Sequence, residues 1–154
     1  MRVFGLAHRG TSMWKVLELS ISGYETKLDE NGIEGSRCVS ETIKNPSWGQ
    51  VRSFVEQLDG DRRDIVDFGG AKGYGLTIGG GPDRFVISVI GDDMGPYSLL
   101  GPDLSDEETT IQYGGVTTTD MERKFIVTRE QTFQAAEYFY LHGQIDPTLK
   151  WHLC

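Results

Sequence analysis

The sequence predicts one α+β domain, in which a twisted, mostly antiparallel sheet of about five to seven strands is covered by two helices. Three observations support this fold class. Short runs of β-branched and aromatic residues recur along the chain, two longer segments with helical spacing begin at capping boxes, and turn residues separate these segments. The length of 154 residues is that of a single domain, so we expect residues 1–154 to fold together.

The N-terminal part, residues 1–42, carries strand signals whose assignment is open. Apolar and polar residues alternate over residues 14–21, which predicts a first strand. The polar segment 25–36 contains Asn31-Gly32 and predicts a turn. A second strand is then expected over residues 37–43.

The first helix is predicted over residues 47–58. Asn45-Pro46 ends the preceding strand, and Ser47 with Gln50 three residues later has the pattern of a capping box. The apolar stripe of this helix is formed by Trp48, Val51, Phe54, Val55 and Leu58.

The middle of the chain predicts several short strands. Residues 65–68 and 74–78 have β-rich composition, and the glycine-rich turn at 79–83 leads into residues 85–90. The last of these runs is apolar on both faces, which is typical of a central strand. A further short strand is expected at residues 110–113.

The C-terminal part predicts a strand followed by the second helix. A strand is expected at residues 125–127, and Thr128 with Gln131 forms a second capping box. The helix is predicted over residues 129–141, and Gly143 is placed to end it in the left-handed conformation. We expect Trp151 to fold back over the end of this helix.

The closing segment resembles that of a family of bacterial immunity proteins. The residues that carry the resemblance are I-V-T-R-E-Q-T-F-Q-A-A-E-Y-F-Y-L-H-G, followed by Leu149-Lys150-Trp151. The family is found beside secreted deaminase toxins, among them the double-stranded-DNA cytosine deaminases. Residues 76–90 look like the central hairpin of the family, and the resemblance spans residues 43–151.

The resemblance implies a non-catalytic protein that needs no cofactor. It implies binding to the toxin domain encoded beside this chain, by which the active site or nucleic-acid groove of the toxin is occluded.

Acidic side chains concentrate in residues 85–122, called here the acidic window. The window contains no Lys or Arg and eight Asp or Glu residues, so it accounts for the whole net charge of −8. Such a surface repels nucleic acid but suits a basic protein whose own ligand is nucleic acid. We expect the toxin to bind here, with aromatic and aliphatic side chains as anchors. The candidate residues are Asp92, Asp93, Tyr97, Leu99, Leu100, Asp103, Asp106, Glu107, Glu108 and Tyr113.

Other functional classes find little support. The glycine-rich segment 69–75 lacks phosphate-binding spacing, and His8, His142 and His152 have no partner at metal-ligand spacing. The zinc deaminase signature is absent as well. The alternatives are an enzyme, a small-ligand-binding domain with a pocket near Tyr74 and Phe85, and a general protein-interaction adaptor.

Location and redox state follow from composition. No apolar run approaches the ~20 residues of a transmembrane helix. The apolar stretch within residues 1–9 is too short for a signal peptide. A cytoplasmic location is therefore expected. Cys38 and Cys154 are too few to suggest a disulfide framework, so we expect free thiols.

Overall fold

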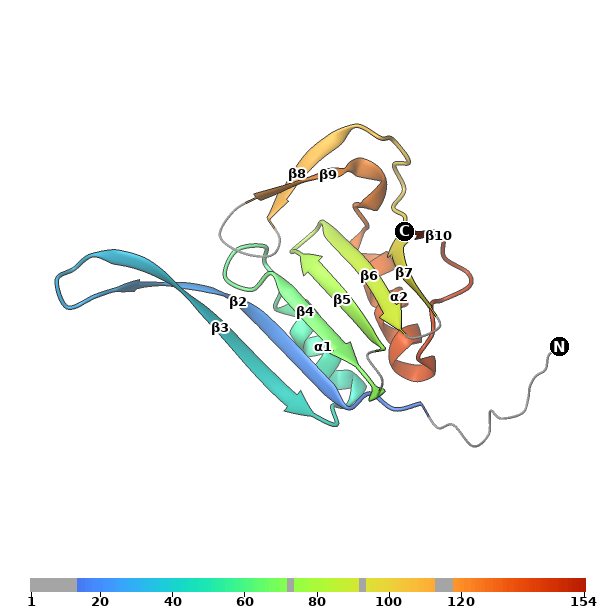
Figure 1. The fold of residues 1–154 in the computed structure, drawn as a ribbon, viewed down its shortest axis with the longest axis horizontal. Coiled ribbons are helices and arrows are strands. Elements are labelled where there is room, and N and C mark those ends of the chain that lie inside the picture. Colours follow the sequence, from blue (N-terminus) through green and yellow to red (C-terminus); the bar gives the residue numbers. More distant parts are fainter. Residues whose placement is uncertain (1–13, 72–73, 92–93, 113–117) are drawn as a thin grey trace.

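Seven strands form one antiparallel sheet, which is the main layer of the fold (Figure 1). The computed structural model describes residues 14–154 except 72–73, 92–93 and 113–117. Across the sheet the strands follow the order β10-β7-β6-β5-β4-β2-β3. Their bounds are β2 (Glu18–Leu28), β3 (Glu34–Lys44), β4 (Ile65–Gly69), β5 (Gly75–Gly80), β6 (Phe85–Gly91), β7 (Met94–Leu99) and β10 (Trp151–Leu153). The predicted α+β fold with a mostly antiparallel sheet is thus confirmed.

Two helices cover one face of this sheet, and both begin where the capping boxes predict. In α1 (Trp48–Glu56) the side chain of Ser47 accepts a hydrogen bond from the backbone of Gln50, and in α2 (Arg129–His142) Thr128 does the same for Gln131. Gly143 ends α2 in the left-handed conformation at φ 69°. No described helix has the length and apolar character needed to cross a membrane.

The core lies between the helices and the sheet. α1 packs against β2 and β4, whereas α2 packs against β5 and β6. Phe139 of α2 is fully buried, and its ring contacts those of Phe68 and Trp14 at centroid distances of 5.7 and 5.3 Å. Ala135 and Ala136 are buried beside it, and their small side chains let the helix approach the sheet closely.

The N-terminal strands are longer than predicted. The predicted turn at 25–36 is wrong, because β2 and β3 pair in register from Glu18↔Lys44 to Leu28↔Glu34. Only residues 29–33 turn the chain. The sequence there is polar because the outer end of this hairpin projects beyond the sheet and residues 26–38 are exposed, so it has no hydrophobic alternation to detect.

The predicted strand at 125–127 is also wrong. Residues Arg123–Phe125 form the short helix η3, and Val127 makes an isolated bridge to Phe85. β8 (Glu108–Gln112) and β9 (Thr118–Glu122) pair with each other in a separate two-stranded sheet, which stands at one end of the main sheet (Figure 1).

Residues 143–154 close the main sheet at the edge opposite β3. Trp151 pairs with Leu99 of β7 and starts β10, and its indole N–H donates to the carbonyl of Asp146 at 2.9 Å. The Asp146 carboxylate accepts hydrogen bonds from the backbone N–H and the hydroxyl of Thr148 at 2.8 and 2.7 Å. A third hydrogen bond comes from the side-chain amide of Gln134 at 3.2 Å. Asp146 therefore joins the closing segment to α2.

Replacing Phe139 tests the packing of α2 on the sheet. Phe139→Ala is expected to lower the free energy of unfolding by about 2–5 kcal/mol, because it empties a fully buried site between two rings. Urea denaturation provides the measurement. Leu141→Ala is the control, because this side chain is 58% exposed and its loss is expected to change stability by less than about 0.5 kcal/mol. Equal midpoints for the two variants would contradict the packing.

The hydrogen bonds of the Asp146 carboxylate predict that the folded protein loses stability in acid. Burial raises the pKa of its carboxyl, but hydrogen bonds from Thr148 and Gln134 and the nearby His142 outweigh burial and leave the pKa below its usual value. The stabilisation is therefore complete above the unfolded-state pKa of about 3.9 and is lost as pH falls through the lower folded-state value.

We expect Asp146→Asn to be less stable than the wild type at pH 7, and the gap to narrow below about pH 4. Denaturation midpoints measured from pH 3 to 7 provide the test. A gap that stays constant down to pH 3 would show that ionisation of Asp146 does not contribute to stability.

Candidate partner-binding surface

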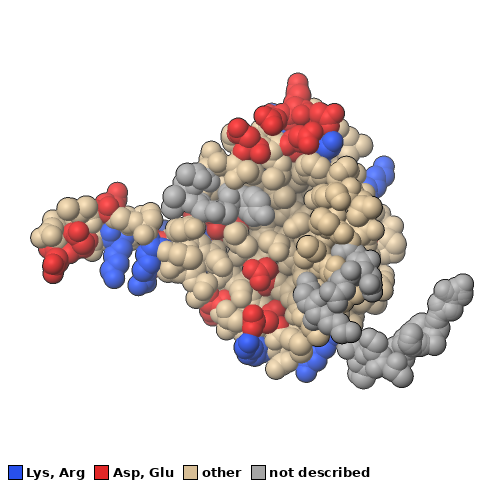
Figure 2. All heavy atoms as spheres, in the orientation of Figure 1, with Lys and Arg blue, Asp and Glu red and all other residues tan. Residues whose placement is uncertain are grey.

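The β8–β9 hairpin, together with the loop before it and η3, forms a lobe on the main sheet. We call residues 101–112 and 118–125 the acidic lobe. Figure 2 shows acidic side chains gathered at the end of the molecule where Figure 1 places β8 and β9, with basic side chains beside them. The six described acids of the acidic window therefore lie together in this lobe.

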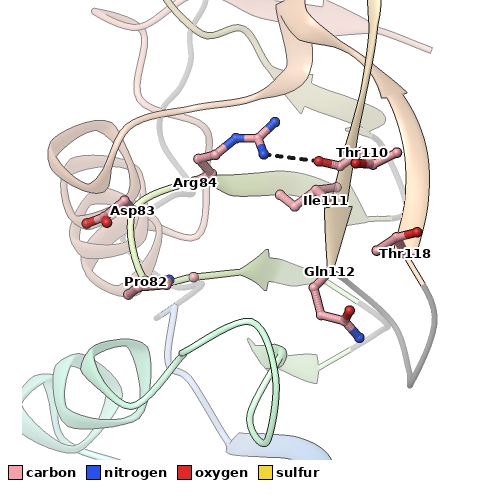
Figure 3. Close-up of a pocket in the computed structure, with 8 residues that line it drawn as sticks. Pro82, Asp83, Arg84, Thr110, Ile111, Gln112 and Thr118 are labelled. Carbon is pink, nitrogen blue, oxygen red and sulfur yellow. Dashed lines mark hydrogen bonds between the residues drawn. The ribbon is translucent and has the colours of Figure 1, made fainter.

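Hydrogen bonds attach the lobe to the turn between β5 and β6. Arg84 donates from its guanidinium to the Thr110 carbonyl at 3.0 Å (Figure 3). It also donates to the Thr109 hydroxyl at 3.0 Å. Within the lobe, the Gly101 N–H donates to the Lys124 carbonyl at 2.8 Å and joins its two segments at the base. A Cβ at Gly101 would lie 1.8 Å from the Ile126 carbonyl oxygen, so this close approach requires glycine.

An apolar contact supports the same attachment. Ile111 of β8 is 5% exposed although its hairpin lies outside the main sheet. Its side chain lies over Gly80 of β5, where an added Cβ would be 3.0 Å from the Ile111 Cδ1. The hairpin is thus held by one buried aliphatic side chain as well as by hydrogen bonds.

Two basic residues just beyond the acidic window neutralise part of it. The Lys124 ammonium lies 2.8 Å from the Asp106 carboxylate and 3.6 Å from that of Glu122, while Arg123 lies 3.9 Å from Glu107. The hydrogen bond from Lys124 holds the pKa of Asp106 below its usual value, and the same bond raises the pKa of Lys124. Half of the six described acids in the window therefore have a basic partner, so the surface is less negative than the sequence predicts.

The other three acids face solvent without an ion pair to any described residue. Asp103, Glu108 and Asp120 are exposed, and the Asp103 carboxylate accepts a hydrogen bond from the backbone N–H of Ser105 at 3.0 Å. Leu104 lies next to Asp103 and is 57% exposed. The lobe thus presents one aliphatic side chain among unpaired carboxylates.

The predicted anchors do not all lie on this surface. Leu99 is fully buried in the core, because it points to the helix-covered face of the sheet. The candidate anchor Leu99 is therefore not on the surface. Tyr97 of β7 and Leu100 are half-buried, whereas Asp103, Asp106, Glu107 and Glu108 are exposed on the lobe. Asp92, Asp93 and Tyr113 lie outside the described residues.

Sequence reasoning missed Leu104. The signal was present, since it is the one large apolar side chain in the polar run from Asp103 to Glu108. A lone leucine in such a run has no periodic partner that would place it in the core, so exposure is the expected result.

A row of polar side chains on the uncovered face of the sheet was also missed. Direct register pairs place one residue from each of the seven strands side by side across this face. The row consists of Thr42, Ser20, Asp67, Thr77, Ser88, Ser98 and His152. It gives the domain a second polar surface, and it could not be found without the strand order.

Two small, open hollows lined by described residues, of about 200 and 210 Å³, flank Asp83 and Arg84, and the first is drawn in Figure 3. Both are below the roughly 300–1,000 Å³ of small-molecule pockets. Phe85, expected to line a ligand pocket, is fully buried in the core. The described residues contain no group of three or more side chains that could hold a metal ion.

These features are typical of an α+β domain that acts through exposed surfaces. The family model described as "Immunity protein Imm1" matches residues 40–153, which is most of the chain. The chain therefore belongs to the Imm1 immunity protein family, and its partner is a cognate toxin. The matched residues begin within β3 and include both helices and the acidic lobe. A comparison with curated proteins finds no match.

Proposed function

We propose that this immunity protein neutralises a nucleic-acid deaminase toxin by covering its active site or substrate groove. The acidic lobe, with Leu104 exposed among unpaired carboxylates, is the observation that carries this proposal. The closing segment, which resembles that of immunity proteins found beside deaminase toxins, supports the choice of toxin. The protein would act in the cytoplasm of the producing cell.

The charge of the lobe suits this role. A toxin that binds nucleic acid needs a basic groove for the phosphates, and such a groove attracts carboxylates at Asp103, Glu108 and Asp120. Opposite potentials speed the encounter and orient the two proteins, whereas affinity comes from desolvated anchors. Leu104 supplies the aliphatic anchor, and the carboxylates around it take the place of phosphates.

The proposal predicts stoichiometric inhibition by competition with the nucleic acid. Purified toxin domain is mixed with increasing amounts of this protein, and deamination of a cytosine-containing DNA duplex is measured. We expect activity to reach zero near one equivalent, and added DNA to slow formation of the complex. A saturated complex that still deaminates would contradict occlusion. A toxin that is neutralised but has another chemistry would contradict the deaminase assignment alone.

The acidic lobe and Leu104 predict separable kinetic effects. Changing Asp103, Asp106, Glu107 and Glu108 together to Asn or Gln is expected to slow association about tenfold at low salt, with little change in dissociation. Leu104→Ala is expected to speed dissociation about tenfold, as loss of an interface anchor does. Surface plasmon resonance at low and physiological salt measures both rates.

Matched controls come from α2. Glu130→Gln and Glu137→Gln remove exposed acids, and Leu141→Ala removes an exposed leucine, all away from the lobe. These variants are expected to bind as the wild type does. Association of the four-acid variant at the wild-type rate in low salt would exclude the lobe as the steering surface.

A further inference from the structure

The outer edge of β3 has no described neighbour. β3 is the last strand in the sheet order, and its eleven residues pair with β2 on one side only. Except for Val39 and Ile43, which are half-buried, its residues are exposed. A long edge of this kind presents unpaired backbone N–H and C=O groups that can pair with another strand.

Half of this edge lies on a projecting arm. β4 pairs with β2 only from Glu18 to Ser22, so residues 23–28 and 34–39 have no third strand among the described residues, although the Tyr24 N–H donates to the Arg62 carbonyl at 3.0 Å (Figure 1). An isolated two-stranded hairpin is marginally stable in water, whereas a third strand stabilises it. The arm would therefore gain most from a partner on the β3 side.

The charges of β3 form an antisymmetric pattern. Glu34 and Lys44 lie five residues on either side of Val39, while Arg37 and Glu41 lie two residues on either side. In both pairs the two members have opposite signs. Reversing the strand about Val39 therefore places every charge opposite its counter-charge.

We propose that two copies of this protein pair through their β3 edges, antiparallel, with Val39 of both copies on the two-fold axis. Glu34 of each copy then lies opposite Lys44 of the other, and Arg37 lies opposite Glu41. The dimer contains four cross-strand pairs of opposite charge, two on each face of the continuous sheet. The proposal does not depend on the chemistry of the toxin.

This register is the one that the charges select. A shift of three residues would bring Glu34 opposite Glu41, or Arg37 opposite Lys44, and like charges directly opposite are destabilising. A shift of one residue would turn the helix-covered faces of the two copies to opposite sides. In the proposed register, residues 34–39 of each arm receive a third strand from residues 39–44 of the other copy.

The acids in the pattern are available for such pairing. Glu34 and Glu41 make no ion pair with any residue that the structure describes, although both are exposed. Each base already faces one acid in its own chain, Arg37 with Glu25 at 3.5 Å and Lys44 with Glu18. The second copy would thus supply the unpaired acids with a base and give each base a second acid.

Charge-swapped variants test the register. Arg37→Glu places two acids opposite each other in both symmetry-related pairs, and Glu41→Arg places two bases there. We expect the wild type to sediment as a dimer, and each variant alone to show a dissociation constant raised about tenfold or more. An equimolar mixture of the two variants restores opposite charges and is expected to dimerise as the wild type does.

Controls keep the result interpretable. Glu137→Arg changes an exposed acid of α2 by the same charge and is expected to leave the dimer intact. Thermal melting of every variant checks that the fold is kept. A wild type that is monomeric at about 100 μM, an Arg37→Glu variant that dimerises as well as the wild type, or a mixture that fails to recover would each overturn the proposal.

Crosslinking of native thiols gives a second test. In the proposed register Cys38 pairs with Ser40, so the two Cys38 side chains are diagonal neighbours about 7–8 Å apart. Cys38 and Cys154 are both free and exposed. A short bismaleimide of matching length is expected to link two copies through Cys38. Cys38→Ser should abolish this product and Cys154→Ser should preserve it, while the reverse result would contradict the pairing.

Discussion

Burial of one sheet face under two helices is the constraint on which this structure depends. α1 covers β2 and β4 while α2 covers β5 and β6, and Phe139 lies where α2 meets Phe68 and Trp14. Burial of aromatic and aliphatic side chains in this layer is the main stabilising contribution, because apolar surface is removed from water there. In the part of the chain that the structure describes, the two α-helices are too few to cover every strand.

The uncovered parts are the ones to which binding is assigned. The acidic lobe is attached by Arg84, by the close approach at Gly101 and by Ile111, so it lies at a fixed place without belonging to the main core. The β2–β3 arm extends the main sheet beyond β4, and its residues 26–28 and 34–38 are exposed. Binding residues commonly lie on such exposed segments held by a rigid scaffold. One scaffold can therefore present a toxin-binding surface and a self-pairing edge at separate places.

Much of the fold could be predicted because its signals are local. Ser47 with Gln50 and Thr128 with Gln131 place the starts of both helices, and β4, β5 and β6 were predicted to within a few residues of their ends. The outer end of the β2–β3 hairpin was not predicted as strand, because a strand exposed on both faces has the composition of a loop. β10 is only three residues long and depends on pairing with β7. No local sequence pattern indicates this pairing.

The candidate site was predicted less completely, since it depends on which charges and side chains meet in space. No local pattern indicates that Arg123 and Lys124 fold back onto the acids before them, because the turn at η3 brings them there. The exposure of Leu99 and Leu104 could not be predicted either. Both are apolar residues near acids, but Leu99 is buried and Leu104 is exposed. Family membership depends on a pattern spread over residues 40–153, and it establishes an immunity protein with a toxin partner. The deaminase remains a proposal.

Hydrogen exchange on the free protein and on the toxin complex tests the central claim most directly. If the toxin binds the acidic lobe, backbone amides of residues 101–112 and 118–125 should exchange more slowly in the complex. Amides of α2 and of the β2–β3 arm should then exchange at the same rate in both states. Protection confined to the uncovered sheet face around Asp67 and Thr77, with the lobe unchanged, would contradict the account.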